Sequence, residues 1–282
     1  MKLVARLFGS TLGKKYIMGL TGLGMVFFVT GHMIGNLQLF LGPEALNKYA
    51  AFLQGLGELL WVVRLGLLGM IAAHIWAALK LSVENKAARP VEYGHGKAPV
   101  GASVASRTML AGGGIVALFI VFHILHYTAC VKAVNFTGID FAHLEYTMKD
   151  GKVVHDVFAM VVYGFKVWYV SLFYIIAVGF LSLHLSHGIS AMCQTLGLRT
   201  HAWWPAISNG AKIWAVVLFL GYAVVPIGVM AGLGKCHIES VKASACCKPP
   251  ATEAVAETDT TATNEDAEAR ASVVIEAIEE GK

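Results

Sequence analysis

The hydrophobic pattern divides the chain as far as Leu233 into long apolar segments separated by shorter polar ones. Five segments reach the roughly 20 apolar residues that a helix needs to cross a bilayer. They are roughly Ile17–Leu41, Leu59–Val83, Thr108–Val131, Val157–Gly188 and Ala211–Leu233, and the long fourth one needs only part of its length to span. In lipid a helix satisfies its own backbone polar groups, and no segment alternates in polarity as barrel strands do. The pattern therefore predicts an all-α integral membrane bundle of five transmembrane helices.

The composition is typical of a chain whose solvent is lipid. Of the 282 residues, 56% are hydrophobic and 14% are charged, whereas a soluble domain carries about 25% charged residues. The formal net charge of +4 is small and scattered along the chain, so we expect no nucleic-acid partner. We expect one membrane domain over residues 1–234 and a separate tail over residues 235–282.

The basic residues between the segments predict how the bundle is oriented. Lysine and arginine collect before the first segment, between the second and third, and between the fourth and fifth. The other two loops carry more acidic than basic residues. Because cytoplasmic loops hold the excess of Lys and Arg, the N-terminus is expected in the cytoplasm and the C-terminus outside.

The tail differs from the rest of the chain in composition. It holds ten acidic and five basic residues, Pro249-Pro250, and runs of Ala, Thr and Glu. This composition is typical of disorder, with a short helix expected near Ala267–Glu280. The five cysteines show no metal-type spacing. Those in the tail, Cys236, Cys246 and Cys247, either form a disulfide outside the cytoplasm or stay free.

Four of the segments contain an internal histidine, a residue that is costly in lipid unless something binds it. A helix rises ~1.5 Å per residue, so position along a segment gives depth. On this scale His32 and His123 each lie about 22 Å along an outward-running segment. His74 lies equally far along an inward-running segment, and His184 lies shortly before Gly188, at the inner end of another. The depths therefore pair His32 with His123 in the outer half, and His74 with His184 in the inner half.

Two imidazoles at one depth on different helices can hold an iron from opposite sides. We therefore expect two b-type haems, one on each pair of histidines. A lone intramembrane histidine could instead make a helix contact or belong to a proton path, but two matched pairs favour haem. Gly31 and Ala73, beside His32 and His74, leave room for a porphyrin or equally for close helix packing.

Four further side chains are candidates for contacts with haem propionates. Arg64 is costly inside the second segment, and a propionate or the membrane interface would each accommodate its charge. Arg107 either serves the inner haem or marks the topology. His126 and His187 each lie three residues from an expected ligand, on the same helix face. Both are alternative ligands, but they lie closer to the interface, so propionate or water contacts are expected for them.

The ordered motifs resemble those of a known family. They are Gly31-His32-Met-Ile-Gly-Asn36, Ala73-His74-Ile-Trp, Phe122-His123-Ile-Leu-His126, His184-Leu-Ser-His187-Gly188 and the loop Asn85–Tyr93. From about Leu12 to Leu233 the chain resembles the dihaem cytochrome b membrane subunit of succinate dehydrogenase and fumarate reductase. The resemblance covers the five segments and leaves the tail outside.

That resemblance implies an anchor and electron-transfer subunit in a bacterial cytoplasmic (inner) membrane. Its partners would be a flavoprotein and an iron–sulfur subunit, with the inner haem nearer the iron–sulfur protein. Quinone, often menaquinone in dihaem members, would react near one haem, and the chain itself would perform no dicarboxylate chemistry. The polar candidates for a quinone site near the outer face are Gln38, Gln54, Glu58 and Tyr127; solvated interface positions are the alternative for each.

One position departs from the family, and two other classes of protein remain as alternatives. Some members carry a glutamate two residues before the fourth-segment ligand, but Ser182 stands there, which argues against a transmembrane proton path through that residue. A cytochrome b anchor of a hydrogenase or formate dehydrogenase is the nearest alternative. A haem-free transporter or scaffold is another, although such proteins favour intramembrane carboxylates and interrupted helices.

Overall fold

The computed structural model describes residues 8–88 and 107–247. The chain separates into two compact units, Met1–Glu239 and Ser240–Lys282. All the long helices and all the residues of the candidate site belong to the first unit.

Five helices of the first unit are long and apolar enough to cross a membrane. They are α2 (Thr11–Leu37, extended by the 3₁₀ turn η1, Gln38–Leu41), α4 (Glu58–Ala87), α6 (Met109–His123, extended by the π-helical η2, Ile124–Thr128), α9 (Trp168–Thr195) and α10 (Trp204–Met230). Their outward faces carry large apolar side chains, including Phe27 and Leu118, as expected where lipid is the solvent. The prediction of an all-α bundle with five such helices is confirmed.

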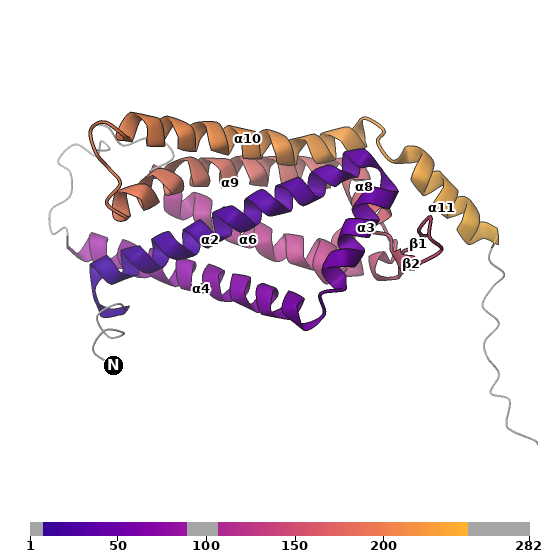
Figure 1. Ribbon diagram of the computed structural model, residues 1–282, viewed down its shortest axis with the longest axis horizontal. Helices are drawn as coiled ribbons and strands as arrows, with labels where there is room; N and C mark the ends of the chain where they lie inside the picture. The colour runs from indigo at the N-terminus through magenta and orange to yellow at the C-terminus, as the bar shows by residue number, and fades with distance from the viewer. Residues whose placement is uncertain (1–7, 89–106, 248–282) are drawn as a thin grey trace, which may run out of the picture. The chain divides into compact units, whose positions relative to one another are not determined.

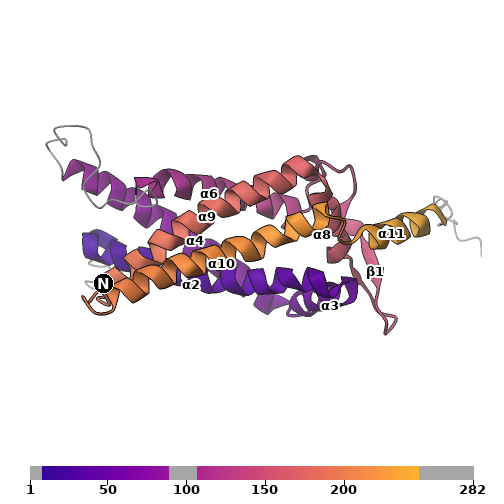
Figure 2. The same cartoon turned by 90° about the horizontal axis from the view of Figure 1, so that it is seen from above.

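The long helices pack in a chain of neighbours. Helix α2 contacts α4, α9 and α10, and α9 contacts α6 and α10. Helices α9 and α10 lie side by side along most of their length (Figure 1 and Figure 2). Near the start of α2, the Ser10 hydroxyl accepts from the backbone N–H of Gly13 at 3.0 Å. Lys14 forms an ion pair with Glu84 of α4, which joins the two helices at this end.

The fourth predicted segment is divided, and the part of it that is long enough to span a membrane belongs to the second helix. Helix α8 (Val157–Lys166) ends at an extended residue, Val167, and α9 begins at Trp168. The buried Ser171 hydroxyl donates to the carbonyl of Phe165 at 2.6 Å, a carbonyl that the break removes from the helical hydrogen-bond pattern. Helix α9 continues to Thr195, so His184 lies well inside it instead of near its end.

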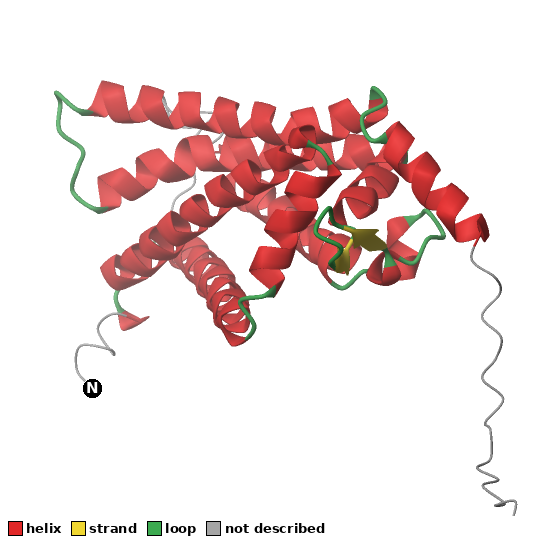
Figure 3. Ribbon diagram, turned by 45° about the vertical axis from the view of Figure 1, so that its right-hand side comes forward, coloured by secondary structure: helices red, strands yellow, loops and turns green. Residues whose placement is uncertain are grey.

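Small elements gather where α2 ends and α9 begins, and we call them the cap. They are α3 (Pro43–Gln54), α7 (Lys132–Asn135), η3 (Phe141–His143), the strands β1 (Glu145–Thr147) and β2 (Val153–His155), and α8. The antiparallel strands pair Tyr146 with Val154, and Gly151 in their turn has φ +83°. Figure 3 shows this hairpin among the helices.

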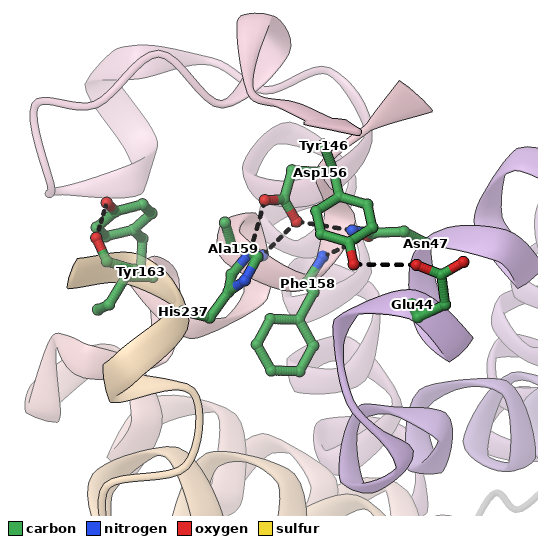
Figure 4. Close-up of polar contacts among 9 residues, drawn as sticks. Glu44, Asn47, Tyr146, Asp156, Phe158, Ala159, Tyr163 and His237 are labelled. Atoms are coloured by element: carbon green, nitrogen blue, oxygen red, sulfur yellow. Dashed lines mark hydrogen bonds and ion pairs between the residues drawn. The ribbon is translucent and has the colours of Figure 1, made fainter. Parts of the chain in front are cut away.

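A fully buried carboxylate, Asp156, ties the cap together (Figure 4). It accepts from Asn47 Nδ2 of α3 at 2.9 Å, from the N–H of Ala159 at 2.9 Å and from His237 Nε2 at 2.8 Å. The Asn47 side-chain oxygen accepts in turn from the N–H of Phe158 at 2.9 Å. Burial by itself raises the pKa of Asp156, but these hydrogen bonds, that from His237 foremost, hold the pKa below its usual value.

The beginning of the predicted tail is ordered. Helix α11 spans Lys235–Cys247, and its first turns reach the cap through His237 and the fully buried Ile238. The structural boundary therefore falls after Glu239, slightly later than the composition suggested. Cys236 is an exposed free thiol. The helix expected near Ala267–Glu280 lies outside the described residues.

Candidate functional site

The four internal histidines form two pairs. His74 of α4 and His184 of α9 have ring centroids 6.2 Å apart, with an interplanar angle of 60°. His32 of α2 and His123 of α6 have centroids 5.7 Å apart, with an angle of 78°. The structure thus brings together the same pairs that depth along the segments suggested. We call His74 and His184 the cap-distal pair, and His32 and His123 the cap-proximal pair.

The helix lengths explain why the cap-distal pair meets. His74 lies as far beyond the first residue of α4 as His184 lies beyond the first residue of α9, about 24 Å along the helix axis in each case. Both helices begin at the cap end of the bundle, so the two rings reach the same level. His32 and His123 each lie little more than one turn before the end of α2 or of η2, which places them nearer the cap.

The ring of His74 is held in one orientation by hydrogen bonds from a neighbouring helix. Its Nδ1 lies 3.0 Å from the carbonyl oxygen of Met18 and 3.2 Å from the Thr21 hydroxyl, both on α2. A carbonyl only accepts, so Nδ1 carries the proton and Nε2 keeps its lone pair. Metal-bound histidines generally show this arrangement, in which the second nitrogen donates to a carbonyl or hydroxyl.

Glycines stand against both rings of the cap-distal pair. A Cβ atom on Gly22 would lie 3.4 Å from Cε1 of His74, and one on Gly113 would lie 3.3 Å from Cε1 of His184. Both distances are at or below ordinary van der Waals contact, so larger residues would push the imidazoles aside. The absence of side chains at these two positions therefore lets the helices approach the rings closely.

Aromatic side chains surround the cap-proximal pair. The ring of Phe28 stacks on His32 with centroids 5.5 Å apart, and the ring of Tyr222 lies 6.2 Å from His32. The Tyr222 hydroxyl donates to the carbonyl of Val29 at 2.6 Å. These contacts confine His32 between α2 and α10, with its ring directed at His123.

Tyr174 links His123 to a second histidine on the same helix. Its hydroxyl lies 3.4 Å from Nδ1 of His123 and 3.0 Å from Nδ1 of His126. If His123 binds a metal through Nε2, its Nδ1–H donates to Tyr174. The tyrosine hydroxyl then donates to His126, so the hydrogen-bond direction along this chain is fixed.

His126 does not occupy the interface position that the sequence suggested. It is fully buried, and its ring stacks on Tyr127 with centroids 4.0 Å apart. The cap covers it through Phe141, 5.8 Å away. The cap encloses this end of α6, so His126 is not exposed at the membrane interface, and the water or propionate contact expected for it stays a prediction. The π-helical turn η2 contains His126, and such turns are frequent at functional sites.

The separation of the ring centroids in each pair leaves room for one metal ion between two imidazoles. Two metal–nitrogen bonds of about 2 Å would separate the donor nitrogens by about 4 Å, with the ring centroids further apart, as observed. Simple aromatic packing covers about 4.5–7 Å, so distance alone does not identify a metal. The repetition of the pair and the fixed tautomer of His74 are the stronger observations.

The described donors at each level are two imidazoles. The described residues contain no group of three or more His, Cys, Asp or Glu side chains that could hold a metal ion. Two imidazoles alone leave an iron four ligands short of six, and a porphyrin supplies four nitrogens in one plane. Each pair supplies the two imidazole nitrogens that a haem with two histidine ligands would need from the protein.

The two candidate arginines, Arg64 and Arg107, make no described contact with the histidine pairs. Arg64 is exposed, and its guanidinium lies 5.0 Å from the centroid of the Trp61 ring, a cation–π arrangement. Arg107 is exposed just before α6, and His187 is half-buried one turn beyond His184. Neither arginine is brought to an imidazole by a described contact.

Of the four quinone candidates, Tyr127 makes a ring contact with a member of a histidine pair. Its ring centroid lies 6.0 Å from that of His123, and its buried hydroxyl has no hydrogen-bond partner in the part of the chain that is described. Gln38 is half-buried in η1, whereas Gln54 and Glu58 are exposed. The exposed pair fits the alternative of solvated interface positions.

Sequence reasoning missed Thr21, Tyr174 and the glycines that face the rings. Only the folded bundle brings these residues to their histidines, since each lies on another helix. No protein-family model matches the chain, and no curated protein or solved structure matches it significantly. The candidate site therefore rests on the geometry described above.

Proposed function

We propose that this chain is the dihaem cytochrome b membrane subunit of a succinate:quinone oxidoreductase. It would anchor a flavoprotein and an iron–sulfur subunit to a bacterial cytoplasmic membrane. There it would carry electrons between the iron–sulfur subunit and quinone, with menaquinone the expected quinone. The observation that carries the proposal is the presence of two histidine pairs at two levels, each joining two membrane-length helices.

Haem, when bound, supplies a one-electron centre whose potential depends on its ligands and surroundings. The residues of this chain hold and orient it. His74 and His184 would hold the cap-distal haem, with Thr21 and the Met18 carbonyl fixing the tautomer of His74. His32 and His123 would hold the cap-proximal haem, supported by Tyr174.

The expected orientation of the bundle determines on which side of the membrane each histidine pair would lie. The positive flanks favour a cytoplasmic location for the cap-distal end of the bundle, which would bring His74 and His184 nearer the iron–sulfur subunit. The cap-proximal pair then lies toward the outer face, where Tyr127 is the best-placed quinone candidate because of its unpartnered hydroxyl. Gln38, Gln54 and Glu58 remain as weaker candidates for the same site.

The purified complex tests the class of the protein. A reduced-minus-oxidised spectrum should show b-type haem, and the copurifying subunits should contain flavin and oxidise succinate. Copurification with nickel or molybdenum subunits would instead indicate an anchor for a hydrogenase or formate dehydrogenase. The absence of any b-type band would contradict the haem assignment itself.

A further inference from the structure

A groove of about 580 Å³ runs along the outer side of the contact between α9 and α10. The small residues Gly179 and Ala215 line it, while Ile176, Val216 and Phe219 provide its apolar walls. Ile176 and Val216 are exposed, so the groove opens toward the surrounding lipid. The two helices that form it are the pair that lies side by side in Figures 1 and 2.

The groove has a positive charge at one end. Lys212 lies about two turns into α10; it follows Ser208 and Asn209 and precedes the apolar run that begins at Ile213. This change in polarity marks the level at which lipid headgroups meet the hydrocarbon core. Lys212 is exposed, and it forms no ion pair with any acidic residue in the described ranges.

The length of the groove matches one leaflet. The lining of α9 extends from Ser186, at the level of Lys212, to Ile176, a distance of about 15 Å along the helix. Half of a hydrocarbon core ~30 Å thick is the same length. The apolar part therefore begins at the headgroup level and ends near the middle of the bilayer.

A hydroxyl in the wall is also unsatisfied. Ser182 Oγ is buried without a hydrogen-bond partner among the described residues, whereas Ser186 donates its hydroxyl to the carbonyl of Leu183 at 2.8 Å. Unpartnered buried hydroxyls are uncommon and call for an explanation. An ester carbonyl of a bound lipid is an acceptor of suitable chemistry, because it sits just below the phosphate.

We propose that this groove binds an anionic phospholipid. The phosphate pairs with Lys212, and one acyl chain lies along Gly179 and Ala215 toward Phe219. Juxtamembrane lysines attract anionic lipids electrostatically, and the small residues let the chain approach the helix backbones. A quinone head would need polar partners at both of its carbonyls, and the groove offers one cation at its mouth and one hydroxyl. The site does not depend on haem.

Native mass spectrometry of the purified full-length protein tests this proposal. The protein would be reconstituted in nanodiscs with equal amounts of palmitoyl-oleoyl phosphatidylglycerol and phosphatidylcholine, and the lipids retained after release would be counted. The wild type should retain phosphatidylglycerol preferentially. Lys212→Gln should lower that retention roughly fivefold, the effect of removing one lysine–lipid attraction.

Lys80→Gln is the matched control, because Lys80 is an exposed lysine about two turns before the end of α4 at the same end of the bundle. It should retain the lipid as the wild type does. Gly179→Leu fills the groove without removing charge, since a Cβ there meets only Phe219 at 3.8 Å, and it should lower retention while thermal unfolding stays unchanged.

Equal retention of the two lipids by the wild type would overturn the proposal. So would equal retention of phosphatidylglycerol by Lys212→Gln and Lys80→Gln. Release of a quinone instead of a phospholipid from the wild type, lost on Gly179→Leu, would assign the groove to a different ligand and would also refute it.

Discussion

The hydroxyl of Tyr174 lies 3.4 Å from Nδ1 of His123, an expected haem ligand. If His123 binds a metal through Nε2, Tyr174 accepts from its Nδ1–H and donates to His126, which would make the His123 imidazole a stronger donor toward the metal. Tyr222 is a second tyrosine beside the same pair, but its hydroxyl bonds to a backbone carbonyl of α2. Substitution of Tyr222 is therefore a suitable control for substitution of Tyr174.

Replacing Tyr174 by Phe should raise the midpoint potential of one haem. The loss of one hydrogen bond, about 0.5–1.5 kcal/mol, corresponds to roughly 20–60 mV for a one-electron couple. Tyr222→Phe should leave that potential near the wild-type value. A spectroscopic redox titration measures both variants, and equal potentials in all three proteins would show that Tyr174 does not support a ligand.

Gly113 and its neighbour Gly114 allow a second test at the residue scale. A Cβ on Gly113 would lie 3.3 Å from His184, whereas a Cβ on Gly114 would meet nothing within 4 Å. Gly113→Leu should therefore displace the His184 ring and remove one of the two haems. Gly114→Leu should keep both, with the same change in helix propensity. Haem per polypeptide in the pyridine haemochrome assay distinguishes these outcomes, and equal losses would contradict the close contact.

At the scale of elements, the long apolar segments were predictable because length and hydrophobicity alone define a membrane helix. The break at Val167 was not, because no proline interrupts the apolar run and the Ser171–Phe165 hydrogen bond that accompanies it forms only after folding. The hairpin could have been predicted from the sequence, because Asp150-Gly151 is a typical turn sequence. Its packing with α3 and α11 depends on contacts between segments that lie far apart in the sequence.

Asp156 should make the cap sensitive to acid. Because the folded pKa lies below the usual value of about 3.9, the carboxylate contributes stability above that value. This stability is lost as the pH falls through the folded pKa. Asp156→Asn should lower stability by about 1–3 kcal/mol at neutral pH and flatten the pH dependence below pH ~4.

Asp140→Asn provides the control for that experiment. Hydrogen bonds from Lys132 and His143 lower the pKa of Asp140 to about 2, but this side chain is partly exposed and its partners are exposed, and ion pairs at such surface positions contribute little to stability. Thermal unfolding followed by circular dichroism between pH 3 and pH 7 compares the variants. An unchanged pH profile in Asp156→Asn would show that the buried carboxylate does not stabilise the cap.

At the scale of the whole molecule, the sequence could predict which histidines meet, because alternating helix directions turn residue spacing into depth. It could not predict the support around them, because Thr21, Tyr174 and Gly113 lie on other helices. It also misplaced His126, since nothing in an apolar segment reveals that a cap will cover its end. The error in the end of the fourth segment did not alter the pairing, because His184 still lies level with His74.

The predicted orientation can be measured with exposed thiols at opposite ends of the first unit. In a background without other cysteines, Cys236 should react with a membrane-impermeant maleimide added to intact cells, because it lies at the end expected outside. A cysteine introduced by Lys80→Cys should react only after the membrane is opened. The reverse pattern would invert the topology and assign the cap to the cytoplasm.

The central claim is that iron is held between helices by two independent histidine pairs, and haem counts in paired variants test it most directly. The wild type should hold two haems per polypeptide, and His74→Ala and His184→Ala should each hold one. The double variant of His74 and His184 should still hold one, whereas the double variant of His74 and His123 should hold none. Equal counts in the two double variants, or no haem in the wild type, would contradict the account.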